Sequence, residues 1–224
     1  METKTSDAVR LPRPGGLKLT ERAISLCRLE TGDGVLDVGC GPGESVAYMR
    51  ERRDLRAVGI DRCAETLAEA PEEMSPHLIE GDAHALPFSD DKFDAVFFEC
   101  SLSKMDDPDM ALCESFRVLR PGGSLAVSDF FTTGGVRMLS GVLGRMETRA
   151  HWAKRLRTAG FEIEHEEDRT GDLRALWGQL VFQYGLERML AVLYPDGQAL
   201  SGDEIGYFLT VARKRVKSDG LSKV

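Results

Sequence analysis

A glycine-rich segment at positions 35–44, VLDVGCGPGE, has the residue types and spacing of a ligand-binding turn. Gly39, Gly41 and Gly43 follow a short apolar run, and a helical pattern follows them. Glycines at such a turn let the backbone approach a ligand without a Cβ in the way, and the start of the helix presents free N–H groups. The segment therefore predicts a ligand site rather than a plain turn.

The acidic residue ahead of this turn indicates the charge of the ligand. The dinucleotide-binding pattern G-x-G-x-x-G needs a third glycine at a position where this chain has Glu44. Asp37 lies two residues before Gly39, and a carboxylate there suits a positively charged ligand better than a doubly negative pyrophosphate. The ammonium and sulfonium groups of S-adenosylmethionine meet that requirement.

Two more acidic residues follow later apolar runs. Asp61 comes after Asp37 at close to the ~20-residue spacing of an acid that binds ribose hydroxyls, and a helix cap is its alternative role. Asp82, in Gly81-Asp82-Ala83, can accept a hydrogen bond from an adenine amino group. Because parallel strands end at one edge of a sheet, all three acids are expected to face one crevice.

The elements that must position these residues alternate between strands and helices. Strands are expected at 35–38, 56–61, 77–80, 93–99, 124–130, 161–166 and 204–212, and helices at 20–29, 44–52, 64–70, 108–119, 148–160 and 172–193. This alternation predicts right-handed βαβ units and a parallel sheet covered on both faces. The expected fold class is α/β, a doubly wound sandwich, in which the glycine-rich connection at 132–148 indicates a mobile connection or lid.

The composition excludes several classes. The 224 residues, 42% hydrophobic and 29% charged, suit one globular domain, and the net charge of −8 argues against bulk attachment to nucleic acid or anionic lipid. No apolar run reaches the ~18 residues of a membrane span, and no secretory signal pattern opens the chain. The five cysteines form no CxxC pair, so reduced thiols and a cytoplasmic location are expected.

The segments VLDVGCGPGE, VGID, GDAHALPF, FDAVFFE and FRVLRPGG, in this order, strongly resemble class I S-adenosylmethionine-dependent methyltransferases, especially the ubiquinone and menaquinone C-methyltransferase group. The resemblance covers about residues 29–130, with 204–212 as the seventh strand, and implies a Rossmann-like seven-stranded sheet with helices on both faces. It implies S-adenosylmethionine as cofactor, no metal, and these donor-binding residues: Asp37, Gly39, Cys40, Gly41, Gly43, Asp61, Arg62, Asp82, Ala83, Glu99 and Cys100.

Methyl transfer to a small-molecule acceptor is the activity that the resemblance implies. The reaction is a direct displacement, so alignment and exclusion of water matter more than acid–base groups. Glu99 is the best-placed candidate base, with a pocket or loop contact as its alternative. His84 is expected to flank the adenine as a loop residue, and His151 to face either the substrate or solvent on a helix surface. Asp129, at the end of the fifth strand, has both a functional and a structural alternative. Enzymes that methylate exocyclic amines carry (N/D)-P-P-(Y/F) where this chain has 99–102, ECSL, which argues against DNA as the acceptor.

Two other functions stay open at this point. Cys100 and Cys27 are similar in position to thiols of arsenite methyltransferases, although no cysteine follows Cys113 to complete a set of three. A noncatalytic protein that binds S-adenosylmethionine is the second alternative.

We expect one methyltransferase domain over 1–224, with an N-terminal helical segment (1–30), a donor-binding core (31–131), a substrate-side embellishment with the sixth strand (132–203), a final strand (204–213) and a tail (214–224). The expected assembly is a monomer or homodimer, whose partner is a small-molecule substrate, with no nucleic acid and no membrane span.

Overall fold

A computed structural model of the chain describes residues 12–139, 143–195, 197 and 204–215. The strands are β1 (Gly34–Val38), β2 (Arg56–Asp61), β3 (Leu78–Glu80), β4 (Phe93–Glu99), β5 (Leu119–Thr132), β6 (Arg137–Met138), β7 (Arg145–Met146), β8 (Phe161–Asp168) and β9 (Ile205–Lys214). The α-helices are α1 (Gly16–Cys27), α2 (Glu44–Arg53), α3 (Ala64–Leu67), α4 (Pro108–Val118), α5 (Arg149–Thr158), α6 (Thr170–Tyr184) and α7 (Leu186–Leu193), and two 3₁₀ turns are η1 (Glu72–His77) and η2 (Leu102–Lys104).

Seven of these strands form one sheet in the order β3-β2-β1-β4-β5-β9-β8, and β6 pairs with β7 in a separate hairpin. The strands from β1 to β5 pair in parallel, as the alternation of strands and helices predicted. β9 instead runs antiparallel between β5 and β8, so the sheet is mixed rather than wholly parallel. The seven-stranded Rossmann-like α/β fold is confirmed.

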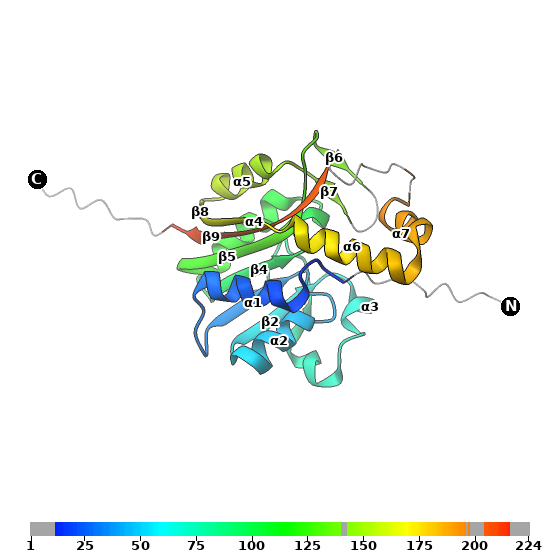
Figure 1. The fold of residues 1–224 in the computed structure, drawn as a ribbon. Helices are drawn as coiled ribbons and strands as arrows, with labels where there is room; N and C mark the ends of the chain where they lie inside the picture. The colour runs from blue at the N-terminus through cyan, green and yellow to red at the C-terminus, as the bar shows by residue number, and fades with distance from the viewer. Residues whose placement is uncertain (1–11, 140–142, 196, 198–203, 216–224) are drawn as a thin grey trace, which may run out of the picture.

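Helices cover both faces of the sheet (Figure 1). One buried cluster joins α1, α2, α6 and α7 to inward residues such as Val35 and Phe97, and the other joins α4 and α5 to Leu36 and Phe98. Successive residues of a strand point to opposite faces, so a strand buried on both sides is apolar throughout. This explains the apolar run at 95–98 within β4.

Three expected boundaries were wrong. The first helix begins at Gly16 rather than at Thr20, which lies buried inside α1 and is not its cap. The long helix expected at 172–193 is divided into α6 and α7 by Gly185, whose φ of +82° is outside the helical region and ends α6. α3 stops at Leu67. The segment 132–148 was expected to be a mobile connection or lid. In the structure it contains the paired strands β6 and β7, and residues 140–142 lie outside the described residues.

The cysteines at 27, 40, 63, 100 and 113 are all free. Across the described ranges, no helix combines the length and the apolar character that crossing a bilayer requires.

Candidate functional site

The glycine turn joins β1 to α2 at the carboxyl edge of the sheet. β1 lies between β2 and β4, where the strand order reverses, and open α/β sheets bind ligands at this point. Gly39, Gly41 and Gly43 have φ values of +73°, +56° and +82°, which side chains other than glycine rarely allow. A Cβ on Gly39 would lie 2.5 Å from the Cβ of Ser101, so the turn also packs against the segment after β4.

Asp61, the last residue of β2, connects the glycine turn to the start of α3. Its Oδ2 accepts a hydrogen bond from the N–H of Gly41 at 2.9 Å, and its Oδ1 accepts one from the N–H of Cys63 at 3.0 Å. Each carboxylate oxygen retains a further lone pair. Asp61 therefore shapes the turn and can still accept hydrogen bonds from ligand hydroxyls.

Asp82 and His84 follow β3 as a bonded pair. Oδ1 of Asp82 accepts from the His84 N–H at 2.9 Å and lies 2.7 Å from the ring Nδ1. Nε2 of His84 accepts from the N–H of Asp107 at 3.2 Å, so Nδ1 carries the ring proton. The bond from the His84 N–H lowers the pKa of Asp82 and keeps it ionised. His84 therefore orients Asp82, whose other oxygen can accept a ligand hydrogen bond.

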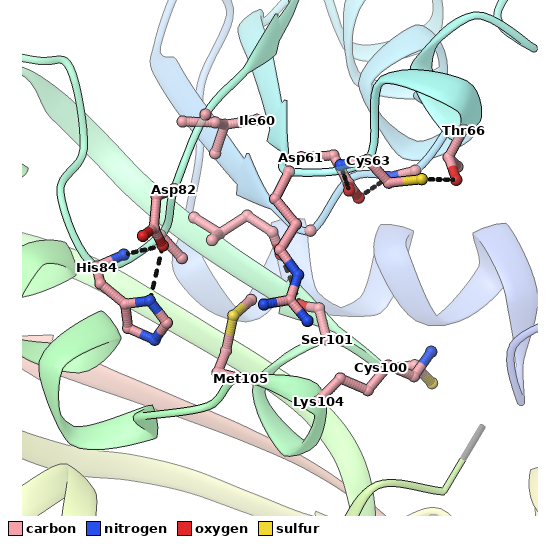
Figure 2. A pocket seen from close by; sticks show the side chains of 16 residues that line it. Ile60, Asp61, Cys63, Thr66, Asp82, His84, Cys100, Ser101, Lys104 and Met105 are labelled. Atoms are coloured by element: carbon pink, nitrogen blue, oxygen red, sulfur yellow. Dashed lines mark hydrogen bonds and ion pairs between the residues drawn. The ribbon is translucent and has the colours of Figure 1, made fainter. Parts of the chain in front are cut away.

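These segments surround one cleft with a volume of about 330 Å³ (Figure 2). Seven of the predicted donor-binding residues line it: Gly39, Gly41, Asp61, Arg62, Asp82, Ala83 and Cys100. Sequence reasoning missed Thr66, Ser101, Lys104 and Met105, which also line the cleft. They come from α3 and from the segment after β4, where no local motif singles them out.

Four of the predicted residues do not line the cleft: Asp37, Cys40, Gly43 and Glu99. Cys40 donates to the carbonyl of Gly41 at 3.4 Å, and a Cβ on Gly59 would lie 2.5 Å from the Cys40 sulfur. Burial is the main reason that the pKa of the Cys40 thiol is raised. Gly43 packs against Leu78. Cys40 and Gly43 thus hold the turn against β2 and β3.

Asp37 is buried, with 2% of its surface exposed. Its Oδ1 has no hydrogen-bond partner among the described residues. Burial, followed by the charge of Glu99, raises the pKa of Asp37 to about 8, while Arg13 acts in the opposite direction. An unpartnered buried carboxylate oxygen is costly unless a donor or a cation reaches it.

Glu99, the candidate base, is held by three other side chains. Its Oε1 accepts from Thr20 at 2.8 Å, its Oε2 accepts from Ser45 at 2.5 Å, and Arg13 pairs with Oε2 at 3.4 Å. Arg13 also donates to Thr20 at 2.7 Å. The carboxylate therefore joins α1, α2 and the segment before α1, behind the cleft rather than in it.

Cys100 stands at the end of the cleft in a left-handed backbone conformation, with a φ of +57°. Such a φ is rare for a non-glycine residue and is typical of functional turns. Its sulfur lies 2.9 Å from the Oη of Tyr207, which donates to the Oγ of Ser128 at 3.2 Å. Burial raises the pKa of the Cys100 thiol to about 12, so this side chain is a neutral thiol at physiological pH.

The remaining candidates have structural partners. Asp129 is buried and accepts from the N–H groups of Ser103 and Phe130, each at 2.8 Å. His151 is exposed, and its ring Nδ1 lies 3.1 Å from the Oγ1 of Thr148, which caps α5. Within the described ranges, no group of three or more His, Cys, Asp or Glu side chains has the geometry to hold a metal ion.

Residues 36–127 match a family described as "Methyltransferase domain". The chain is 29% identical over 229 residues to 27-O-demethylrifamycin SV methyltransferase of Amycolatopsis mediterranei, covering 88% of this chain and 83% of that protein. It is 37% identical over 121 residues to 2-phytyl-1,4-naphtoquinone methyltransferase of Synechocystis sp., covering 50% of this chain and 51% of the relative. The chain therefore spans only about half the length of this second relative.

Solved structures share the fold. The [4+2]-cyclase SpnF is 27% identical with a TM-score of 0.72, and the match covers 89% of this chain and 80% of that chain. Phosphoethanolamine N-methyltransferase 2 of Haemonchus contortus, solved with S-adenosylhomocysteine, is 18% identical with a TM-score of 0.73, covering 91% of this chain and 54% of that chain. Residues 36–127 therefore match a methyltransferase domain, and the glycine turn, the cleft and the shared fold are those of an S-adenosylmethionine-dependent methyltransferase.

Proposed function

We propose that the cleft holds S-adenosylmethionine across the carboxyl ends of β1, β2 and β3. The glycine turn faces the methionine side, Asp61 accepts from the ribose hydroxyls, and Asp82 with the N–H of Ala83 binds the adenine. Arg62, paired with Asp106 at 2.7 Å, borders the ribose position. The observation that carries this assignment is that acids from two successive strands and the glycine turn line one cleft.

The unpartnered carboxylate of Asp37 supports placing the methionine part of S-adenosylmethionine beside the glycine turn. Its buried Oδ1 has no donor among the described residues, and Gly39, which lines the cleft two residues later, has no room for a Cβ beside Ser101. A ligand ammonium group would supply the missing donor and would favour the ionised carboxylate. The residues present therefore fit a cationic donor.

The chain's contribution to methyl transfer is positioning. S-adenosylmethionine, when bound, supplies a methyl group that the sulfonium already activates. The chain has to align the acceptor and exclude water. Because Thr20, Ser45 and Arg13 engage Glu99, we propose that this carboxylate positions α1 and Arg13 and does not remove a proton.

We propose a small organic molecule as the acceptor. The Amycolatopsis and Synechocystis relatives are named for a rifamycin and a naphthoquinone, which are small organic acceptors. The finer resemblance to the ubiquinone and menaquinone C-methyltransferases stays a prediction, since the relatives also include an O-methyltransferase of Aspergillus nomiae.

We further propose that the chain forms one methyltransferase domain with the boundaries given in the sequence analysis. We propose that it acts in the cytoplasm as a monomer or homodimer and does not bind nucleic acid.

The arrangement of the thiols argues against arsenite as the acceptor. Cys27 interacts with Ser124, whereas the Cys100 N–H donates to the carbonyl of Ser128. Four residues of β5 separate these contacts, or about 13 Å at ~3.3 Å per residue. Burial raises the pKa of Cys27 and of Cys100 to about 12, so neither is the thiolate that a soft metalloid needs.

Calorimetry tests the donor assignment. The chain should bind S-adenosylmethionine and S-adenosylhomocysteine but not NAD, and labelled methyl groups from the donor should appear in an organic metabolite extract. Binding of NAD, in place of S-adenosylmethionine and S-adenosylhomocysteine, would contradict the cofactor assignment. Arsenite-dependent methyl transfer that is lost in both Cys27→Ser and Cys100→Ser would contradict the organic acceptor.

A further inference from the structure

An apolar pocket lies beside the donor cleft, with a volume of about 70 Å³. Six apolar residues of its lining come from α6, α7 and β5, outside the segments that carry the predicted donor-binding residues: Leu173, Leu176, Trp177, Leu180, Leu193 and Phe130. The rest of the lining is Pro12, Arg13, Pro14, Cys100 and Lys104. Because the pocket is small, it can accept one apolar group rather than a whole large molecule.

Two side chains belong to both spaces. Cys100 and Lys104 line the donor cleft and the apolar pocket, so the two spaces meet there. In Figure 2 both are labelled at the same end of the donor cleft, away from Asp82 and His84. A methyl group passing from donor to acceptor has to cross at such a junction.

Lys104 brings a free positive charge to this junction. The residue is exposed, and its ammonium group forms no hydrogen bond or ion pair with any other part of the chain that the structure describes. Arg13, the other cation that lines the apolar pocket, is already engaged by Thr20 and Glu99. The junction therefore favours an anionic group on whatever occupies the apolar pocket.

The acidic and nucleophilic groups nearest to the junction already have partners among the described residues. The Cys100 thiol and the Tyr207 hydroxyl are neutral, because burial raises both pKa values far above physiological pH. Asp129 is buried and is bonded by two backbone N–H groups, and Glu99 is bonded by three side chains. A neutral hydroxyl acceptor would thus meet, among these groups, only neutral side chains and carboxylates that already accept hydrogen bonds.

We propose, resting on the donor assignment above, that the acceptor is a phenol- or enol-type compound that binds as an oxyanion, with an apolar group in the α6–α7 pocket and its negative charge against the Lys104 ammonium. The hydroxyl proton leaves to water on binding. An electron pair of the conjugated anion forms the bond to the methyl carbon, and the carbon–sulfur bond breaks with its pair going to sulfur. Lys104 replaces a general base by stabilising the reactive anion.

The test uses 4-nitrophenol, whose phenol and phenolate forms absorb at different wavelengths, with saturating S-adenosylhomocysteine. In the wild type, a positive charge nearby should make the ratio of phenolate to phenol in the bound probe about tenfold larger than in free solution at the same pH. Lys104→Met should abolish this increase and Lys104→Arg should keep most of it. Lys154→Met removes an exposed lysine of α5 that lines neither space, and it should behave as the wild type.

A second pair of variants locates the probe. Leu176→Glu puts a negative charge into the pocket and should weaken 4-nitrophenolate binding at least about tenfold, whereas Phe182→Glu, on the exposed side of α6, should not. Equal ionisation of the bound probe in wild type and Lys104→Met, or no binding of the probe by the wild type, would overturn the proposal. Calorimetry with S-adenosylhomocysteine separates the two claims, since its failure to bind rejects the donor site itself.

Discussion

The donor cleft and the apolar pocket differ in how the chain builds them. The cleft is lined by the glycine turn and by side chains from the carboxyl ends of β1 to β4 and the segments that follow these strands. The pocket is lined mainly by apolar side chains from helices α6 and α7 and by Pro12, Arg13, Pro14 and Phe130, and it shares Cys100 and Lys104 with the cleft. The first is a set of loops at one edge of the sheet, and the second forms only when the N-terminal segment and two late helices pack on one face.

This difference separates the part of the site that depends on backbone geometry from the part that depends on the shape of packed side chains. Binding of a common donor depends on backbone geometry, which tolerates little change. Binding of an acceptor depends on the shape of an apolar surface, which other apolar side chains of similar volume can rebuild. Changes in the cleft should therefore affect the donor alone, and changes in the pocket should affect stability and the acceptor.

The largest effect on the donor is expected from Gly39→Ala. The added Cβ would lie 2.5 Å from the Ser101 Cβ in a residue whose φ is +73°, so overpacking and backbone strain combine. Affinity for S-adenosylhomocysteine, measured by calorimetry, should fall at least about 100-fold. Gly32→Ala is the matched control, because Gly32 has a φ of +84° and nothing within 4 Å of its added Cβ. An equal loss of affinity in both variants would show that backbone strain alone lowers the affinity, and that the packing of the glycine turn against Ser101 does not.

Leu180→Ala should mainly reduce stability. Leu180 is buried at 4% exposure between α6 and the sheet, and removing such a side chain costs about 2–5 kcal/mol of unfolding free energy. Phe182→Ala on the same helix is the control, because Phe182 is 95% exposed and its loss should change stability by less than about 0.5 kcal/mol. Urea unfolding measures both. A large loss of donor affinity in folded Leu180→Ala would contradict the separation of the two regions.

Asp61→Ala should weaken donor binding by about 1–3 kcal/mol, because the N–H groups of Gly41 and Cys63 lose their acceptor. Asp106→Ala is the control at the same rim. It removes only an exposed ion pair with Arg62 and should leave donor affinity nearly unchanged. Calorimetry that finds equal affinity for wild type and Asp61→Ala would remove Asp61 from the site.

A separate effect is expected on the pH dependence of stability. Burial raises the pKa of Asp37 to about 8 in the folded protein, so the folded state holds this proton more tightly than the unfolded chain. The stability that this proton contributes is complete below the ordinary carboxyl pKa and is lost as the pH rises towards 8. Relative to Asp37→Asn, the wild type should lose at most ~1.4 kcal/mol of unfolding free energy per pH unit in this range.

Urea unfolding at several pH values measures this difference, and saturating S-adenosylhomocysteine should reduce it, because the ligand ammonium favours the ionised carboxylate. Curves that stay parallel for wild type and Asp37→Asn would mean that Asp37 does not titrate in this range.

The amino-acid sequence by itself predicted most of the residues that line the cleft where we propose the donor binds. Gly39, Asp61 and Asp82 each lie next to the strand that positions them, so a local pattern carries both the element and the functional residue. The parallel pairing from β1 to β5 then brings these short segments to one edge, as the βαβ alternation requires. Local sequence and topology together were sufficient for this part.

Only the tertiary structure decided the roles of Glu99 and Lys104. Glu99 ends a strand as a catalytic residue would, but Thr20 bonds it from 79 residues away because α1 packs on that face of the sheet. Lys104 follows no motif, and the pocket beside it depends on α6 and α7, which Gly185 separates. Contacts of this kind arise from helix packing between distant segments, and such packing leaves no periodic or local signal in the sequence.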